Sequence, residues 1–216
     1  MFDWHYALSL LPQLLEGFEV TLLATAGGML LALLLGLLWA VLRRAAPLPL
    51  AWVVRWLVEF IRSTPLLVQL YFLFFVLPDF GLRLSPFATG VLALGLHYSA
   101  YTAEVYRAGI EAIPRHQWEA ALALNLGRTR TWVGIILPQA IPPVIPALGN
   151  YLIAMLKDSP LLAAITVSEI LQIAKLIGAE SFRYLEPLTL VGLLFLLVSL
   201  LSSRLIGRLE KRYGRI

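Results

Sequence analysis

The sequence predicts an all-α membrane protein with about five transmembrane helices. Hydrophobic residues make up 60% of the 216-residue chain and charged residues only 14%, and the mean hydropathy is +0.82. Uncharged stretches of about 20 residues, the length that crosses a bilayer as a helix, recur between short charged segments. This length and composition indicate one integral membrane domain and are not typical of a soluble protein.

Five apolar segments are the expected spans. They are residues 20–42, 63–77, 84–103, 131–156 and 187–203. The segment 1–19 before them carries acidic residues but no Lys or Arg, which argues against a cleaved signal peptide. We expect it to form a short amphipathic helix at the periplasmic surface of the membrane. The membrane domain is then 20–207, and a basic cytoplasmic tail follows over 208–216.

The fourth segment has an unusual proline content. Four prolines lie within it: Pro138, Pro142, Pro143 and Pro146. Proline removes a helical hydrogen bond and clashes with the preceding turn, so we expect the N-terminal half of this span to be bent or broken. The polar sequence 157–160 interrupts the apolar run at its other end.

The basic residues set the expected orientation. Thirteen of the 17 Lys and Arg residues fall in the loops after the first and third spans and in the C-terminal tail, and four fall on the opposite side. Positive charge collects on the cytoplasmic side, so we expect the N-terminus outside and the C-terminus in the cytoplasm. The same rule accounts for the net charge of +4 without a nucleic-acid partner.

Residues 115–138 form a candidate helix–turn–helix on the cytoplasmic side. A short helical pattern over Glu119–Leu124 breaks before Gly127, which we expect to end the helix in the left-handed conformation. Thr129 or Thr131 is expected to cap the next helix through its hydroxyl. From the spacing alone, a surface helical hairpin with no special role is an equally good interpretation.

Glu104 is the most informative polar residue at membrane depth. It follows twenty uncharged residues and lies close to Tyr98. A carboxylate there costs on the order of 3 kcal/mol on insertion scales, so it is expected to face a cavity or a partner. One hypothesis is that Glu104 and Tyr98 are part of a solute pathway. The other is a structural pair with Arg107, three residues along the same helix.

A second polar group comprises Asn150, Lys157 and Asp158, near the interruption of the fourth segment. Interrupted helices offer free backbone groups to solutes in transporters, so Asn150 and Asp158 are also candidates for the pathway. Alternatively, Lys157 and Asp158 only cap a helix at the outer surface.

The sequence lacks the features of an enzyme. None of its lysines follows a glycine, so it has no G-x-x-x-x-G-K-[ST] phosphate-binding loop, and we expect no ATP or other cofactor on this chain. There is no cysteine, and the three histidines, His5, His97 and His116, lie far apart in the sequence. We therefore expect no metal site.

Glu119-Ala120-Ala121, with Gly127 six residues later and Ile136-Leu137-Pro138 beyond, resembles the EAA loop of permease subunits in ATP-binding-cassette (ABC) importers. Other stretches are similar to the polar amino acid branch of these permeases: 62–69, 103–110, 117–121 and 137–140. Residues 142–151 and 182–189 look closest to an ectoine/hydroxyectoine permease subunit. The similarity covers roughly residues 15 to 210. The chain departs from the usual pattern at Ser63, where many relatives have glycine, and at Ser159-Pro160.

The resemblance implies a type I ABC importer permease fold in the bacterial inner membrane, with the loop 115–138 docking on a separate ATPase. The implied coupling residues are Glu119, Ala120, Ala121, Leu124, Gly127 and Arg128. The implied partners are ATPase subunits that bind the ATP, a second permease chain, identical or paralogous, and an extracytoplasmic solute-binding protein. The solute would be a polar amino acid or a similar zwitterion, with ectoine as the narrower inference.

The competing hypothesis is a stand-alone secondary carrier. It would need its own ion-coupling site, for which Glu104 and Asp158 are the candidates.

The orientation gives a direct test, because the chain has no native cysteine. We expect a cysteine at Asn125 to react with an impermeant maleimide only after the cells are opened, since that loop is expected in the cytoplasm. A cysteine at Gly81 should react in intact cells when the reagent reaches the periplasm. Labelling at position 125 in sealed cells would reverse the orientation.

Overall fold

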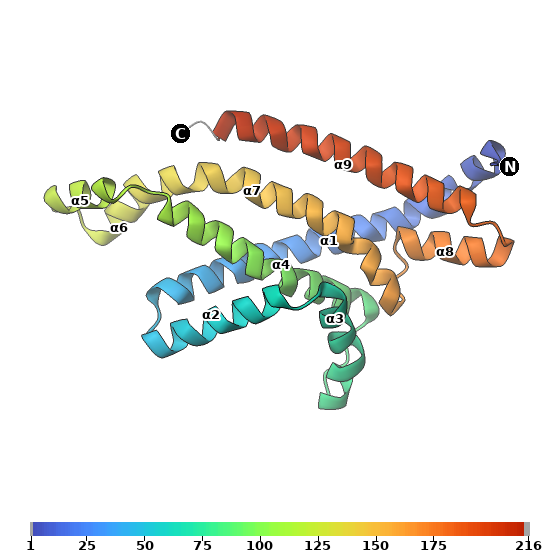
Figure 1. Ribbon diagram of the computed structural model, residues 1–216, viewed down its shortest axis with the longest axis horizontal. Helices are drawn as coiled ribbons and strands as arrows, with labels where there is room; N and C mark the ends of the chain where they lie inside the picture. The colour runs from blue at the N-terminus through green and yellow to red at the C-terminus, as the bar shows by residue number, and fades with distance from the viewer. Residues whose placement is uncertain (1, 214–216) are drawn as a thin grey trace.

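The structure is a computed structural model that describes residues 2–213, and all regular structure in these residues is helical (Figure 1). The α-helices are α1 (Trp4–Ala45), α2 (Leu48–Ser63), α3 (Leu66–Tyr71), α4 (Pro86–Glu111), α5 (Arg115–Ala123), α6 (Arg128–Thr131), α7 (Leu137–Asp158), α8 (Ile170–Ser181) and α9 (Leu185–Tyr213). Two π-helical segments, η1 (Phe72–Val76) and η3 (Trp132–Ile136), and two 3-10 segments, η2 (Leu77–Phe80) and η4 (Ser159–Ile165), join them. The all-α prediction is confirmed. The end of the expected tail, 214–216, lies outside the described residues.

The long helices run side by side, and the short helices α5, α6 and α8 lie at the two ends of this bundle (Figure 1). The short helices α5 and α6 are at one end, and α8 is at the other with the N-terminus. Within residues 2–213, three helical stretches are long and apolar enough to cross a membrane: α1, residues 128–165 and α9. The bent pair α2–α3 raises this number to four when it is taken as one span. Helix α4 has 26 residues but more polar side chains, and its span remains a prediction.

Helix α1 is one continuous helix of 42 residues. The expected boundary between an N-terminal segment 1–19 and a span beginning at Val20 is therefore absent from the secondary structure. The Asp3 carboxylate caps the helix by accepting hydrogen bonds from the backbone N–H groups of His5 and Tyr6, at 3.0 and 3.1 Å. At about 1.5 Å per residue α1 is roughly 60 Å long, about twice the thickness of the apolar core of a bilayer.

The core is built on the contact between α1 and α4, the most extensive between any two helices. Gly36 allows the closest approach: a Cβ added there would clash with the Thr102 hydroxyl and come within 2.9 Å of the Ser99 carbonyl oxygen. The Thr102 hydroxyl donates to the Ala32 carbonyl oxygen at 2.8 Å across the same contact. Small residues and a hydroxyl thus bring the two backbones together, as is common between membrane helices.

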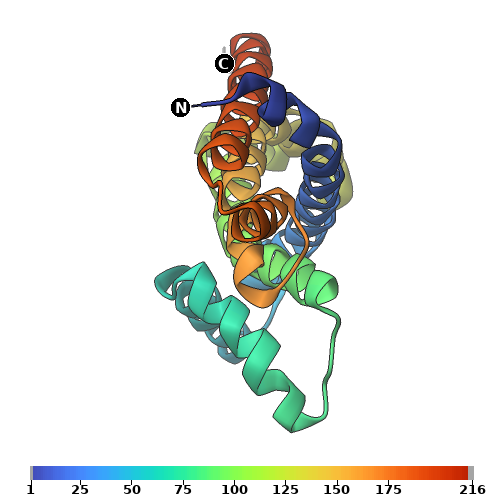
Figure 2. The same cartoon turned by 90° about the vertical axis from the view of Figure 1, so that its right-hand side faces the viewer.

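The second apolar segment differs from the prediction. The expected span began at Ser63, but α2 already begins at Leu48, and α2 and α3 meet at an angle of 105° at Thr64–Pro65. Proline forces the preceding residue out of the helical region, and Thr64 has φ −107° and ψ 138°. Helix α3 packs against α4 through Leu66 and Leu70, and the chain continues through η1 and η2 away from the rest of the bundle (Figure 2).

One side chain bridges this bend. The Gln69 amide nitrogen donates to the carbonyl oxygens of Ile61 at 2.7 Å and Thr64 at 3.1 Å, and to the Thr64 hydroxyl at 2.7 Å. Its amide oxygen lies 3.2 Å from the His97 Nδ1 atom on α4. Gln69 therefore supplies donors to carbonyl groups that the end of α2 leaves free, and ties the bend to α4.

The fourth span is not broken at its prolines, so the expected break is absent. Pro142, Pro143 and Pro146 lie inside α7, and residues 128–165 form one continuous spanning stretch. The irregularity is instead the π-helical segment η3 just before Pro138, where the wider turn is one of the adjustments that accommodate proline in membrane helices. The expected interruption at 157–160 is confirmed by the change from α7 to the 3-10 segment η4.

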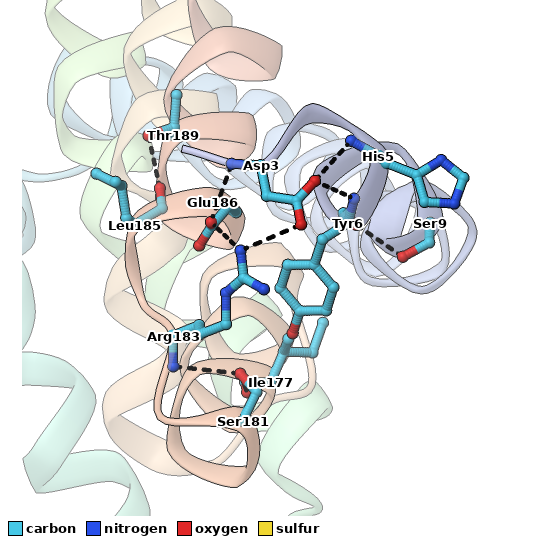
Figure 3. A network of polar contacts seen from close by, with 10 residues as sticks. All are labelled: Asp3, His5, Tyr6, Ser9, Ile177, Ser181, Arg183, Leu185, Glu186 and Thr189. Atoms are coloured by element: carbon cyan, nitrogen blue, oxygen red, sulfur yellow. Dashed lines mark hydrogen bonds and ion pairs between the residues drawn. The ribbon is translucent and has the colours of Figure 1, made fainter. Parts of the chain in front are cut away.

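The N-terminus is fixed to the start of α9 (Figure 3). Arg183, in the turn between α8 and α9, forms an ion pair with Glu186 and lies 3.7 Å from the Asp3 carboxylate. Its guanidinium also covers the Tyr6 ring, 4.2 Å from the centroid. The Asp3 backbone N–H donates to the Glu186 carboxylate at 3.3 Å. The first and last helices are thus joined at their outer ends.

Glu169 is a fully buried carboxylate just before α8. It caps that helix by accepting hydrogen bonds from the backbone N–H groups of Gln172 at 2.7 Å and Leu171 at 3.0 Å. Burial nevertheless raises its pKa to about 7, because desolvation of the charge outweighs these hydrogen bonds and the pull of Lys175.

The bend predicts an effect of Gln69→Leu. Removing the amide leaves the Thr64 carbonyl without its donor and the Ile61 carbonyl with only the 3.3 Å contact from the Thr64 hydroxyl. This should cost roughly 1–3 kcal/mol and loosen the angle between α2 and α3. Spin labels at positions 57 and 75 should report a broader distance distribution in the variant. The exposed neighbour Val68→Leu is the control, and an unchanged distribution in Gln69→Leu would contradict the role of this side chain.

Glu169 predicts a pH dependence of stability. The pKa of the Glu169 carboxyl is higher in the folded protein than in the unfolded chain. Its contribution to the free energy of unfolding is therefore fully present below about pH 4.5 and is lost as the pH rises to about 7. The loss is on the order of 2–3 kcal/mol.

The measurement is the melting temperature of the purified protein at pH 5.5 and 8.5, for the parent and for Glu169→Gln. The variant should melt below the parent at pH 5.5, where it lacks the second N–H acceptor, and at or above it at pH 8.5. Parallel pH profiles for the two proteins would contradict the assignment.

Candidate functional sites

The segment 115–138 forms the expected helix–turn–helix, but its turn differs from the prediction. Gly127 has φ −61° and ψ 151°, which is extended backbone, and precedes α6 as its N-cap. The left-handed residue is Asn125, with φ 50°. Asparagine tolerates this conformation better than most residues with a Cβ. The Leu126 N–H donates to the Ala121 carbonyl oxygen at 3.0 Å and closes the end of α5.

The expected threonine cap of α6 is also absent. No side chain caps this helix, and the Thr131 hydroxyl donates to the Gly127 carbonyl oxygen at 3.3 Å instead. Space does not require glycine at position 127 either, because an added Cβ would meet nothing within 4 Å. The turn is therefore set by Asn125 and by backbone hydrogen bonds.

The loop presents a mixed apolar and charged surface. Of the six predicted coupling residues, five are exposed: Glu119, Ala120, Leu124, Gly127 and Arg128. Ala121 is buried against the loop itself. Leu122 and Leu124 are 80% and 71% exposed, and Leu122 was missed because its neighbours in the sequence are equally apolar. Leu122, in the last turn of α5, and Leu124, at its C-cap, thus form an exposed apolar surface beside charged groups.

An arginine joins this loop to the end of α1. The Arg44 guanidinium lies 5.5 Å from the ring centroid of Trp118 on α5 and 5.1 Å from that of Trp132 on η3. The two indole rings meet edge to face at 5.3 Å. Such cation–π contacts are worth about 0.5–2 kcal/mol each, depending on exposure. The contact spans more than seventy residues of sequence, and no local pattern indicates it.

Only two of the four predicted pathway residues come together. The Tyr98 hydroxyl donates to the Asp158 carboxylate at 2.7 Å, which links the middle of α4 to the end of α7. Two further tyrosines complete an aromatic cluster around this pair: the Tyr151 ring lies 6.2 Å from that of Tyr98 and 5.5 Å from that of Tyr101. Arg62, at the end of α2, covers Tyr101 at 5.6 Å.

His97 and Gln69 border this cluster. The His97 ring packs against those of Tyr98 and Tyr101, at 5.5 and 5.2 Å, and also contacts Gln69. The cluster is thus connected to the bend between α2 and α3. No pattern in the sequence indicates these roles, since both residues lie singly in apolar runs.

The other two predicted residues lie elsewhere. Glu104 forms ion pairs with Arg107 and with Arg43 on α1, so the structural pairing with Arg107 is present and has a second arginine added. Asn150 faces α9, where its amide donates to the Glu210 carboxylate at 3.2 Å. It is not part of a group with Asp158.

Comparison with known proteins gives the family. The model of the family described as "Binding-protein-dependent transport system inner membrane component" matches residues 32–215. A probable amino-acid ABC transporter permease protein, y4tG of Sinorhizobium fredii, is 49% identical over 201 residues, which cover 93% of this chain and 87% of the relative. The glutamine transport system permease protein GlnP of Escherichia coli K12 is 35% identical, with 98% and 97% covered.

Solved structures agree. An amino acid ABC transporter crystallised with histidines has a chain with a TM-score of 0.93 and 34% sequence identity, with 98% of this chain and 99% of that chain covered. A chain of the MetNI methionine ABC transporter has a TM-score of 0.73 at 20% identity, over 93% of this chain and 98% of that chain, and supports the type I importer fold alone. On the match over residues 32–215, the chain belongs to the inner membrane components of binding-protein-dependent transport systems.

Proposed function

We propose that this chain is the permease subunit of an ABC importer for polar amino acids or amino-acid-like zwitterions. The observation that carries the proposal is the exposed helix–turn–helix 115–138 at one end of a membrane bundle, opposite the end that holds α8 and the N-terminus (Figure 1). The relatives named for amino-acid and glutamine transport support the solute class. A second permease chain and an extracytoplasmic solute-binding protein complete the proposed assembly.

The loop is the proposed site of ATPase docking. Leu122 and Leu124 supply the apolar contact, and Glu119 and Arg128 supply charges on either side of the turn. ATP binds and is hydrolysed on the partner, so this chain contributes motion and not catalysis. Arg44, held between two tryptophans, passes displacement of the loop to α1.

The aromatic cluster is the proposed solute site. Asp158 offers a negative charge to the cationic part of a zwitterion, and the tyrosine faces attract the same group through cation–π interaction. Arg62 beside Tyr101 offers a partner for a carboxylate. The narrower proposal, from the resemblance of 142–151 and 182–189, is ectoine or hydroxyectoine, whose delocalised cation suits several aromatic faces.

The secondary-carrier hypothesis is less favoured. Its ion site would need carboxylates that are free of cations, but Glu104 pairs with two arginines, which leaves Asp158 as the single remaining candidate. A carboxylate neutralised by arginine binds a further cation poorly.

Uptake by the reconstituted assembly tests the proposed function. We expect solute accumulation to require ATP, the ATPase subunit and the binding protein, with ectoine, L-glutamine and L-arginine as the radiolabelled probes. Accumulation driven by an ion gradient, by this chain without the ATPase, would support the carrier instead. Uptake of L-arginine or L-glutamine without any response to ectoine would reject the narrower solute.

The turn between α5 and α6 predicts a contrast between two positions. Asn125→Val places a β-branched residue at φ 50° and should open the turn, reducing transport about tenfold while leaving the chain in the membrane. Asn125→Gly should retain transport, since glycine adopts this conformation freely. Gly127→Ala should also retain it, because its backbone is extended and its surroundings are open.

The readout is solute-stimulated ATP hydrolysis in the assembly, with the amount of bound ATPase as a control. Normal coupling in Asn125→Val would contradict the role of the turn. Loss in Gly127→Ala alone would place the requirement at the ATPase contact.

A further inference from the structure

A cavity of about 620 Å³ lies between the last part of α1, α2 and the end of α4. Five arginines and three glutamates line it, together with apolar groups that include Trp52 and Val58. It extends along α2 from Leu48, near the cytoplasmic end of α1, to Arg62 at the bend. The lining is called the ionic groove below.

Helix α2 presents three separate faces. Val54, Val58 and Ile61 are buried in a small core with Ala100. Val53, Trp56 and Phe60 are 56–64% exposed and form an apolar face suited to lipid. The third face carries Arg55, Glu59 and Arg62 at i, i+4 and i+7, and all three line the ionic groove.

Charges on a membrane helix are costly unless they face water or a partner. Their confinement to one face of α2, toward the charged end of α4, indicates that the ionic groove holds water. Arg55 in particular forms no ion pair with any residue in 2–213. The pair between Arg62 and Glu59 is long, at 3.5 Å, with both side chains at least one third exposed.

The ionic groove meets the aromatic cluster at its inner end. Arg62 lines the groove and also covers the Tyr101 ring of the cluster. On α4, Tyr101 of the aromatic cluster and Glu104 of the ionic groove are likewise only one helical turn apart. On the opposite wall Glu104 is already neutralised by Arg43 and Arg107, so the unpaired positive charge lies on the α2 side.

We propose that the ionic groove is the release path of the solute toward the cytoplasm, a water-filled, anion-attracting vestibule in which a solute carboxylate passes from Arg62 to Arg55. This inference rests on the proposed function, and it assigns the class of ligand as a carboxylate-bearing zwitterion. The solute carboxylate would displace Glu59 from Arg62, and Arg55 provides the next cation about two helical turns nearer the cytoplasm.

The groove can be probed without knowing the solute. Ala51 lines it, and a cysteine there is the only thiol of the chain. In nanodiscs holding the full assembly, we expect Ala51→Cys to react with an anionic methanethiosulfonate faster than with a cationic one, by about threefold or more. Adding Arg55→Gln should reduce that ratio toward one. Val53→Cys, on the lipid-facing side of α2, is the control and should react with neither reagent.

Two outcomes would overturn a hydrated groove. One is an unreactive Ala51→Cys, as expected if a lipid headgroup or the second permease chain fills the space. The other is a ratio that Arg55→Gln leaves unchanged.

Transport supplies the second readout, with whichever of the three probes the parent assembly accumulates. Arg55→Gln should lower the maximal uptake rate about fivefold or more without changing the amount of bound ATPase, and Arg208→Gln on α9 should not. Normal uptake in Arg55→Gln would overturn the release path even with a hydrated groove. Failure of the parent to accumulate any probe would instead reject the proposed function. The labelling result would still decide whether the groove is hydrated and attracts anions.

Discussion

The close contact of α1 with α4 is the constraint on which the rest of the structure depends. Gly36 and the Thr102 hydroxyl allow the two backbones to meet. This spacing places Arg43 against Glu104 two turns further along α1. With the larger α1–α4 distance that a side chain at position 36 would impose, the Glu104 carboxylate would lose one of its two arginines in a region where an unpaired charge is costly.

The polar side chains of helix α4 face neighbouring helices, where they find hydrogen-bond partners. Tyr98 reaches Asp158 on α7, His97 reaches Gln69 on α3 and Thr102 reaches α1. Helices that surround it supply the apolar exterior, with exposed leucines along α1 and α9. A criterion based on apolar composition therefore misses α4 as a membrane span. Its polar side chains are tolerated because the helix lies at the centre of the bundle.

Patterns that repeat along one helix could be predicted from the sequence, and contacts between distant segments could not. The apolar runs predicted the all-α fold, and a helix–turn–helix was correctly placed at 115–138. The residue in the left-handed conformation was misplaced because glycine is the stronger signal, whereas the observed turn uses Asn125. The number of prolines likewise did not predict where a helix breaks. The single Pro65 follows a bend of 105°, whereas three prolines lie inside α7 without a break. The pairing of Glu104 with Arg107 follows a local pattern and was predicted. Its second partner Arg43, and the partners of Arg44 and Asn150, lie about 60 or more residues away, beyond any local pattern.

The bend at Thr64–Pro65 makes the segment Leu66–Phe80 a lever with one anchored end. At helical rise this segment is roughly 20 Å long, so a change of about 10° at the bend displaces its tip by roughly 3–4 Å. The anchored end comprises Leu66 and Leu70, which are buried in the core, and the Gln69 carboxamide, which contacts the His97 ring beside the aromatic cluster. A shift of a few tenths of an ångström in the His97 ring would therefore produce a larger displacement at the far end of the segment, near Gly81.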